Sequence, residues 1–411
     1  MRISLIEFSV ENFKIFKKRA TLSTIARKSS HTFENNDENL LRTSLIYGPN
    51  ASGKSTLLQA LDVMKGGILN SANNPSGAML PYFNFTLSEE TETAPIFWEA
   101  IFSLEKRVFK YNFSILKDRV IEENLFGILS DGKEKKYITR KENNIELFED
   151  FKNKDSEDVK SKTRKEVLFL SAVAQWNNKL AMEIIEGFKN INILQGPNSD
   201  LYGGFSLNLF KKDADTKEKM LNFLKRADFC ISDGVVEKVK IPEIVMSQLR
   251  ALNSKENYPE TADVVVFSHK KFNSKNEQIG FQKINMSDES IGTKKFFDVL
   301  GPVIDTIENG KVLLIDEFDN SLHPLLTKFI IDIFEKSNPH NAQLIATTHD
   351  TSLLSYKDDF DKTQFWFTEK DEFGAAKLFS LAEFKMRNDT EFSKKYLEGR
   401  FGALPFIEST N

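Results

Sequence analysis

A glycine-rich loop near the N-terminus is the first pattern in this sequence that could carry chemistry. Its residues are Gly48, Pro49, Asn50, Ala51, Ser52, Gly53, Lys54 and Ser55, followed by Thr56. They match G-x-x-x-x-G-K-[ST] in full, a pattern in which backbone N–H groups surround the phosphates of a nucleotide. We expect Lys54 to reach the β- and γ-phosphates and the Ser55 hydroxyl to bind Mg²⁺. The alternative is a plain glycine turn that carries a surface lysine.

The residues on either side of the loop favour the phosphate-binding interpretation. A short apolar run, 44–47, leads into the loop, and a helical pattern begins at Thr56. Apolar side chains then recur at three- and four-residue spacing, at Leu57, Leu58, Leu61 and Met64. A strand, a glycine loop and a helix in this order form the context that a phosphate-binding loop requires.

A second chemical pattern is a pair of acids at the end of an apolar run. The run 312–315 is directly followed by Asp316 and Glu317. Unpaired buried charge is costly, and a metal-bound nucleotide would explain acids in this position. We expect Asp316 to hold Mg²⁺ and Glu317 to polarise the water that attacks the γ-phosphate. The alternative is a strand-to-loop junction with two exposed acids.

Two further segments, one before and one after the acidic pair in the sequence, could contribute to the same site. The apolar run 344–347 ends near His349, whose imidazole could bond the γ-phosphate. The segment 287–295 contains Ser290 and Gly292 in a turn before a helix, which is a second anion cradle. Such turns more often simply cap helices. The other histidines have no such context, and we interpret them as surface or packing residues: His31, His269, His323 and His340.

The elements that must position these residues indicate an α/β fold with three parts. An N-terminal lobe, 1–150, carries the loop and an antiparallel β-like region at 94–129. A mostly helical insertion, 151–262, follows, with a turn-rich break at 194–204. A C-terminal lobe, 263–411, begins with β-like segments at 264–286. We also predict a loop at 27–39, helices at 296–307 and 325–334, and buried strands at 311–315 and 343–347.

Composition narrows the class of protein without naming an activity. The formal net charge is −4, so the whole chain lacks the basic character of a dedicated nucleic-acid binder. The charge-dense stretch 152–165 mixes signs and reads as a solvated face, although a local basic patch elsewhere stays open. Cys230 is the single cysteine, which excludes an internal disulfide. Without a leader or a long apolar run, we expect a cytoplasmic protein that makes no membrane contact.

Taken together, several motifs resemble the ABC-type ATPase heads of the SMC, RecF and OLD proteins. They are GPNASGKST, IEFSVENFKIF, SDESIGTKK, LLIDEFDNSLHP and ATTHD. The separation of 262 residues between Lys54 and Asp316 fits the long insertion of such heads. The tail, FWFTEKDEFGAAKLFSLAEF with YLEGRFGALPFI, resembles the bacterial AAA15 or RloA-like ATPases of abortive infection.

The resemblance implies a mechanism in which two heads share ATP and Mg²⁺. Ser290 and Gly292 would form the signature turn that contacts the γ-phosphate bound to a second copy, giving a homodimer or higher oligomer. Residues 319–321 fall at the position of the D-loop, which spans the dimer. Glu289 replaces the usual signature leucine, and no residue is assigned to the Q-loop. The chain shows no Toprim nuclease pattern after His349.

The first functional hypothesis is therefore an ATP-driven switch in anti-phage defence. It would regulate a separate effector protein, which we expect to be a Toprim-like or other nuclease. A RecF- or SMC-like DNA-repair ATPase with ATP-gated DNA binding is the main alternative, which would make nucleic acid a partner. A transporter subunit and a nucleotide-bound scaffold with negligible hydrolysis are further alternatives. Trp176, Tyr202 and Phe205, in the insertion, are candidate contact residues, although core or loop packing is the simpler interpretation.

Overall fold

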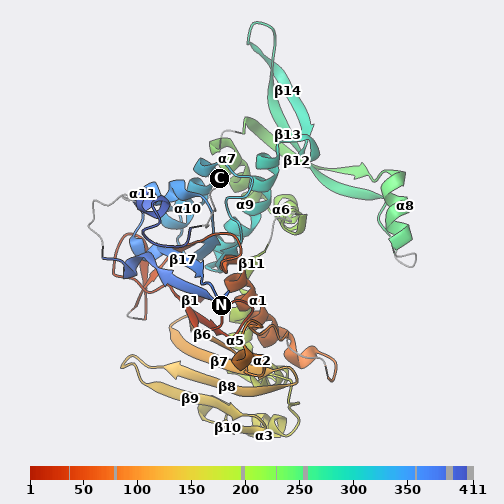
Figure 1. The fold of residues 1–411 in the computed structure, drawn as a ribbon. Helices are drawn as coiled ribbons and strands as arrows, with labels where there is room; N and C mark the ends of the chain where they lie inside the picture. The colour runs from red at the N-terminus through yellow and green to blue at the C-terminus, as the bar shows by residue number, and fades with distance from the viewer. Residues whose placement is uncertain are drawn as a thin grey trace. The chain divides into compact units, whose positions relative to one another are not determined.

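The computed structural model describes residues 1–36, 38–77, 81–195, 200–227, 229–252, 258–356, 359–385 and 392–404. The chain divides into two compact units (Figure 1). Unit 1 comprises residues 1–196, 306–319 and 330–411, and unit 2 comprises residues 197–305 and 320–329. The predicted insertion is thus divided, because residues 151–196 belong to unit 1 and residues 197–262 to unit 2.

An antiparallel sheet of seven strands forms one layer of unit 1, in the order β10-β9-β8-β7-β6-β1-β2. Its strands are β1 (Ile3–Glu11), β2 (Ala20–Ser23), β6 (Ile96–Leu104), β7 (Arg107–Leu116), β8 (Arg119–Ile128), β9 (Glu134–Lys141) and β10 (Asn144–Leu147). The antiparallel run predicted at 94–129 is confirmed, and two more strands extend it.

The second sheet of unit 1 has the order β11-β15-β16-β5-β17-β18. Its strands are β5 (Thr43–Tyr47), β11 (Ile191–Leu194), β15 (Val312–Ile315), β16 (Gln343–Thr347), β17 (Phe365–Lys370) and β18 (Ala376–Ser380). All neighbours pair in parallel except β17 and β18. The three central strands are buried along their whole length, which is the burial expected of a covered parallel sheet. The mixed α/β class predicted from the sequence is confirmed.

One hydrophobic core joins the two sheets with three helices of unit 1. These helices are α1 (Lys54–Asn70), α4 (Phe169–Gln175) and α5 (Lys179–Lys189). Aromatic pairs fill this core, among them Trp98 with Phe113 and Phe102 with Phe188, whose ring centroids lie 5.2 and 5.0 Å apart. The shorter helices of unit 1 are α2 (Glu89–Glu92), α3 (Lys154–Lys160) and α11 (Phe392–Leu397).

Unit 2 contains a separate antiparallel sheet with the order β12-β13-β14. Its strands are β12 (Ile231–Lys240), β13 (Thr261–Phe272) and β14 (Gln278–Asn285). Helices α6 (Asp200–Lys212), α7 (Ala214–Arg226) and α8 (Glu243–Leu252) lie in its sequence, and α9 (Ile291–Asn309) and α10 (Pro324–Lys336) contribute residues to it. Phe297 is packed between the rings of Phe210 and Phe267, at 5.6 and 5.9 Å.

Three expectations about local structure were wrong. The predicted loop 27–39 contains a hairpin of β3 (Thr32–Asn35) and β4 (Glu38–Leu41), because Phe33 and Leu40 are buried against Ile6. Strand β12 lies where we expected helix, since its valines pair along β13. Of the predicted break at 194–204, residues 196–199 lie outside the described residues, whereas 200–204 begin helix α6.

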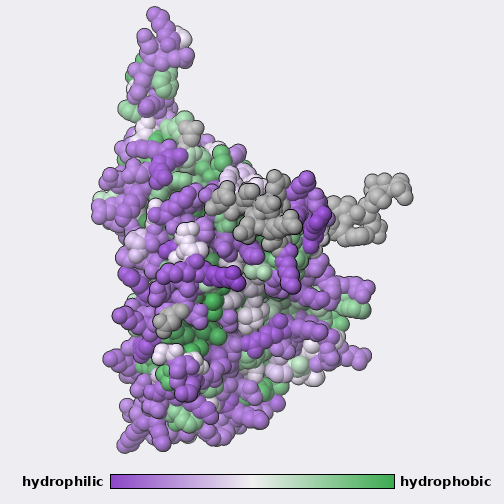
Figure 2. Space-filling model, turned by 90° about the vertical axis from the view of Figure 1, so that its left-hand side faces the viewer, coloured by the Kyte–Doolittle hydropathy of each residue, from purple (hydrophilic) through white to green (hydrophobic). Residues whose placement is uncertain are grey.

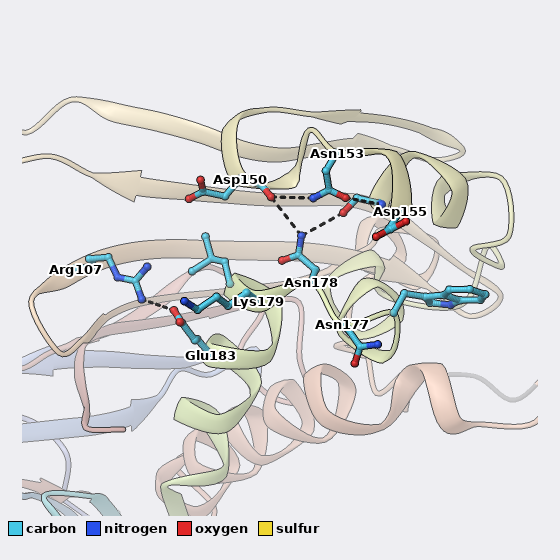
Figure 3. A pocket seen from close by; sticks show the side chains of 11 residues that line it. Arg107, Asp150, Asn153, Asp155, Asn177, Asn178, Lys179 and Glu183 are labelled. Carbon is cyan, nitrogen blue, oxygen red and sulfur yellow. Dashed lines mark hydrogen bonds and ion pairs between the residues drawn. The ribbon is translucent and has the colours of Figure 1, made fainter.

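A cluster of polar side chains in unit 1 lines a cavity of about 440 Å³ where α3 and α5 begin (Figure 3). The Asn178 amide donates to the Asp150 carbonyl and the Ser156 hydroxyl, at 3.4 and 3.2 Å, and Arg107 pairs with Glu183 at 2.5 Å. The Asn153 and Asn178 side chains accept hydrogen bonds from the N–H groups of Ser156 and Ala181, so they cap α3 and α5. Trp176 at its edge is 52% exposed, and the Lys162 ammonium lies 4.7 Å from its ring centroid.

A buried carboxylate fastens the antiparallel sheet to helix α4. Glu123 is fully buried and accepts hydrogen bonds from the backbone N–H groups of Phe169 and Leu170, at 2.7 and 2.9 Å. The Tyr111 hydroxyl donates to it at 2.9 Å, and the buried Arg140 guanidinium lies 3.4 Å away. Truncation of one partner of such a pair leaves the other charged and unpaired.

We therefore expect Glu123→Ala to lower the free energy of unfolding by about 3–5 kcal/mol, measured by urea denaturation. The matched control is Glu122→Ala, at the exposed neighbouring position, which should change it by less than about 0.5 kcal/mol. Equal urea midpoints for the two variants would contradict this role for Glu123.

Candidate active site

The glycine loop connects β5 to α1 and has a backbone that only glycine tolerates at two points. Gly48 and Gly53 have φ angles of +153° and +122°. A Cβ at Gly48 would lie 2.5 Å from the Thr368 carbonyl oxygen and 2.6 Å from the Ser52 hydroxyl, so no side chain fits there. The Ser52 and Thr368 hydroxyls are hydrogen-bonded at 2.6 Å, which ties the loop to β17.

Lys54 begins helix α1, and its side chain turns back into the loop. It is 6% exposed, and its ammonium donates to the carbonyls of Gly48 and Pro49 at 2.7 and 3.1 Å. Burial lowers the pKa of Lys54, while the negative charges of Asp316, Asp319 and Glu317 act in the opposite direction. The ammonium therefore lies inside the loop with the three acids close enough to affect its charge.

Asp316 is where the separate motifs meet. Its carboxylate, 7% exposed, accepts hydrogen bonds on Oδ1 from the Ser55 hydroxyl at 3.0 Å and from the Thr347 hydroxyl at 2.6 Å. Ser55 follows the glycine loop and Thr347 ends β16, so residues far apart in sequence converge on one oxygen. The structure thus brings together the loop and the acidic strand.

Glu317 is held in place through its backbone. Its φ is +49°, in the left-handed region that non-glycine residues seldom occupy. The N–H of Glu317 donates to the Thr347 hydroxyl at 2.8 Å, so Thr347 connects both acids of the pair. Backbone strain of this kind persists only where surrounding contacts enforce it, and it is common at functional sites.

His349 lies two residues beyond Thr347 and is positioned by a third acid. Its backbone N–H donates to both carboxylate oxygens of Asp319, at 3.2 and 3.1 Å. The imidazole is exposed, yet its pKa is lowered, first by desolvation from neighbouring protein atoms and second by the charge of Lys54. A neutral imidazole at pH 7 has one nitrogen that donates and one that accepts.

A cavity of about 770 Å³ adjoins the outer side of the glycine loop. Gly48, Pro49, Asn50 and His349 form one side of it, and Glu369 and Tyr396 are among the residues that complete it. The Tyr396 ring stacks on Phe367 at a centroid distance of 5.4 Å, and the backbone N–H of Ala403 donates to Glu369 at 3.3 Å. The C-terminal segment thus forms a wall beside the loop.

The residues present fit a magnesium ion bound with a nucleotide. Mg²⁺ prefers hard oxygen ligands, keeps several waters and commonly takes only one or two protein groups together with phosphates. The Ser55 hydroxyl and the Asp316 carboxylate supply two such oxygens, 3.0 Å apart. Within the described residues, no group of three or more His, Cys, Asp or Glu side chains forms an independent metal site.

Ser290 and Gly292 belong to unit 2. The exposed Ser290 accepts a hydrogen bond from the Thr293 N–H at 3.1 Å and so caps helix α9. A Cβ at Gly292 would lie 3.5 Å from the Ser321 carbonyl oxygen, which places the turn beside the predicted D-loop. Glu289 bonds His269 Nε2 at 2.7 Å, so the unusual residue of the turn has a structural partner.

Sequence reasoning missed the two threonines that hold this site together. Thr347 was recognised only as part of a buried strand, and Thr368 was not considered. The signal for Thr347 was a polar side chain at the end of the strand next to the acidic pair. Nothing in the sequence pairs Thr368 with Ser52, because that contact depends on the position of β17 beside β5.

We expect Thr347→Val to reduce Mg²⁺-dependent nucleotide hydrolysis about 10- to 100-fold, because second-layer groups of metal sites have effects of this size. The loss should appear in kcat and in the Mg²⁺ concentration required, while nucleotide affinity changes less than about threefold. Thr347→Ser keeps the hydroxyl and should restore activity. A valine variant with wild-type kcat would show that the hydroxyl does not position the acids.

Comparisons with known proteins place the chain in a family. A model of the family described as "AAA domain, putative AbiEii toxin, Type IV TA system" matches residues 44–355, which is more than half of the chain. None of the curated proteins matches the sequence significantly. Across the described residues, no helix is both long and apolar enough to cross a membrane.

Solved structures that are similar to this chain include heads of SMC proteins. The head from Thermotoga maritima has 13% identity and a TM-score of 0.44, with 92% of this chain and 99% of that chain covered. An Smc head bound to the C-terminal domain of ScpA, from Pyrococcus furiosus, has 14% identity and a TM-score of 0.43, with 97% and 100% covered.

The family match spans the glycine loop, the acidic pair and His349, which are the residues that the fold assembles at one end of the parallel sheet. The chain therefore belongs to the AAA-domain family whose description names the AbiEii toxin of a type IV toxin–antitoxin system.

Proposed function

We propose that the chain is a Mg²⁺-dependent ATPase whose heads close in pairs around ATP. The observation that carries this proposal is the Ser55–Asp316–Thr347–Glu317 network beside the glycine loop. It unites a hydroxyl and a carboxylate suited to Mg²⁺ with a second carboxylate on a strained backbone. Membership of an AAA-domain family supports nucleotide hydrolysis.

Each residue has a role in this mechanism. The N–H groups of the loop 48–55 bind the phosphates, and Lys54 moves its ammonium from the Gly48 and Pro49 carbonyls to the β- and γ-phosphates. Ser55 and Asp316 hold Mg²⁺, which when bound neutralises phosphate charge. Glu317 orients and polarises the attacking water, and His349 hydrogen-bonds the γ-phosphate.

Closure of two heads would complete the site. Ser290 and Gly292 of a second copy approach the γ-phosphate, where the exposed Ser290 hydroxyl at the start of α9 and the adjacent backbone N–H groups donate hydrogen bonds to the anion. ATP then joins the two copies, and its hydrolysis separates them. Within unit 2, the Ser321 carbonyl oxygen lies 3.5 Å from the position that a Cβ would take at Gly292, which supports a surface formed by the turn together with residues 320–321.

We further propose that the ATPase is a switch in an anti-phage, abortive-infection setting and that it regulates a separate effector of nuclease type. The family description, which names a toxin and a toxin–antitoxin system, supports this setting. The AAA15 or RloA-like membership suggested by the tail belongs to the same proposal. Of that tail, residues 405–407 lie outside the described residues.

Three substitutions test the ATPase and its closure. Lys54→Ala should abolish nucleotide binding, whereas Glu317→Gln should keep binding and lose at least about 100-fold in hydrolysis, which leaves an ATP-loaded dimer. Ser290→Asp preserves the helix cap but repels the γ-phosphate, so its addition to Glu317→Gln should dissolve that dimer. ATP binding by filter assay and mass by light scattering report the two effects.

The controls are exposed residues of the same types, Lys28→Ala and Ser287→Asp, which should behave like the parent proteins. A Glu317→Gln protein that stays monomeric with ATP would contradict closure, and one that hydrolyses ATP normally would contradict the role of Glu317.

A separate effector predicts a division of labour. The purified chain should hydrolyse ATP slowly and leave duplex DNA, single-stranded DNA and RNA intact on a gel. Lys54→Ala serves as the control for contaminating nuclease, because cleavage by a contaminant would not depend on nucleotide. Robust ATP-dependent cleavage by the chain alone would refute a separate effector.

A further inference from the structure

Two strands of the unit 2 sheet, β13 and β14, continue as a two-stranded ribbon beyond the point where β12 stops pairing. Strand β12 pairs with β13 only as far as His269, opposite Ile231. Beyond that pair, β13 and β14 continue alone, with Lys270 opposite Phe281 and Phe272 opposite Gln278 (Figure 1). We call residues 270–283 the ribbon. Its side chains are exposed, apart from half-buried positions at Asn273 and Gly280.

The pairing places lysines and aromatic rings on one face of the ribbon. Residues opposite each other in an antiparallel ladder point to the same face, as do alternate residues of one strand. Lys270 and Phe272 therefore share a face with Phe281, and Lys283, two residues from Phe281, lies on it too. Cross-strand neighbours of this kind have Cβ atoms only about 5 Å apart.

The apolar side chains of the ribbon are unusually open to solvent. Phe272, Ile279 and Phe281 are 52%, 58% and 60% exposed. In Figure 2, hydrophobic side chains appear among hydrophilic ones at the top of the view, where the ribbon ends. A concentration of exposed rings on a short hairpin indicates a surface that binds a partner.

The charge of the ribbon indicates which partner. It contains four lysines, Lys270, Lys271, Lys275 and Lys283, and Glu277 as its acid. Lys283 pairs with Glu237 at 2.6 Å, whereas no ion pair within the described residues engages the other three. In the charge-dense stretch 152–165, by comparison, ion pairs join Lys160 to Glu157, Arg164 to Glu166 and Lys165 to Asp118.

We propose that the ribbon binds single-stranded nucleic acid. Bases stack on Phe272 and Phe281, and Lys270 on the same face contacts the phosphates between them. Lys271 on the opposite face and Lys275 in the turn contact phosphates on either side of the stacked bases. Exposed rings flanked by lysines are the combination that such binding uses, because every base offers a π-face and every nucleotide a negative charge. A duplex keeps its base faces stacked inside, so it cannot use the rings in this way. The proposal does not depend on ATP hydrolysis.

The test uses the full chain and a fluorescein-labelled oligo(dT) of about twenty nucleotides, followed by fluorescence anisotropy. The double variant Phe272→Ala/Phe281→Ala should weaken binding at least about tenfold, and Phe272→Tyr/Phe281→Tyr should retain it. Lys270→Gln/Lys271→Gln/Lys275→Gln should weaken binding and flatten a salt dependence whose log–log slope is about −2 for three phosphate contacts. Phe373→Ala and Lys106→Gln are exposed controls in unit 1.

Each outcome decides the proposal. Unchanged ATP turnover and unchanged thermal midpoints in the ribbon variants show that these proteins are folded, so a specific loss of oligo(dT) binding supports the ribbon. Absence of oligo(dT) binding at low salt would overturn it. So would equal binding by the alanine and tyrosine variants, or binding of a duplex of the same length that competes fully with oligo(dT). Loss of self-association in place of nucleic-acid binding would assign the ribbon to a protein contact and overturn it as well.

Discussion

One carboxylate oxygen, Oδ1 of Asp316, accepts a hydrogen bond from each of two segments that are otherwise distant in sequence. The Ser55 hydroxyl comes from the start of α1, and the Thr347 hydroxyl from the end of β16. This convergence exists because β5, β15 and β16 pair in parallel, so that their carboxyl ends meet at one edge of the sheet. A shift of one residue in that register would turn Thr347 to the other face. The precision of the site therefore depends on the buried sheet beneath it.

Acidic side chains outnumber basic ones among the groups that act on Lys54 and His349 at this edge of the sheet, and this excess of negative charge favours a bound cation. Asp316, Glu317 and Asp319 all lie near enough to Lys54 to affect its pKa, while Lys54 is the only cation among the causes acting on His349. Phosphates would add further negative charge. A divalent ion held by Ser55 and Asp316 is the simplest group that offsets both, since hard oxygen ligands already face each other there. The excess of acidic side chains around Lys54 and the phosphates of the proposed nucleotide thus both favour the same ion.

Features that depend on neighbouring residues in the sequence could be predicted, and features that depend on contacts between distant segments could not. The glycine loop, the buried strands 312–315 and 343–347 and the helix after the loop have local signals, and the structure has these elements. The hairpin of β3 and β4 depends on Phe33 and Leu40 reaching Ile6, and β12 depends on β13 from a distant part of the chain. Thr347, Thr368 and His269 act through partners 20 or more residues away, so their roles become visible only when the sheets are assembled.

The unusual Glu289 acquires a physical meaning from its partner. At the proposed signature turn, where a leucine would pack its side chain, the Glu289 carboxylate instead bonds His269 Nε2 at 2.7 Å. His269 is also the last residue of β13 that pairs with β12, and Lys270, the first residue of the ribbon, follows it directly. The hydrogen bond thus ties the residue beside Ser290 to the base of the ribbon.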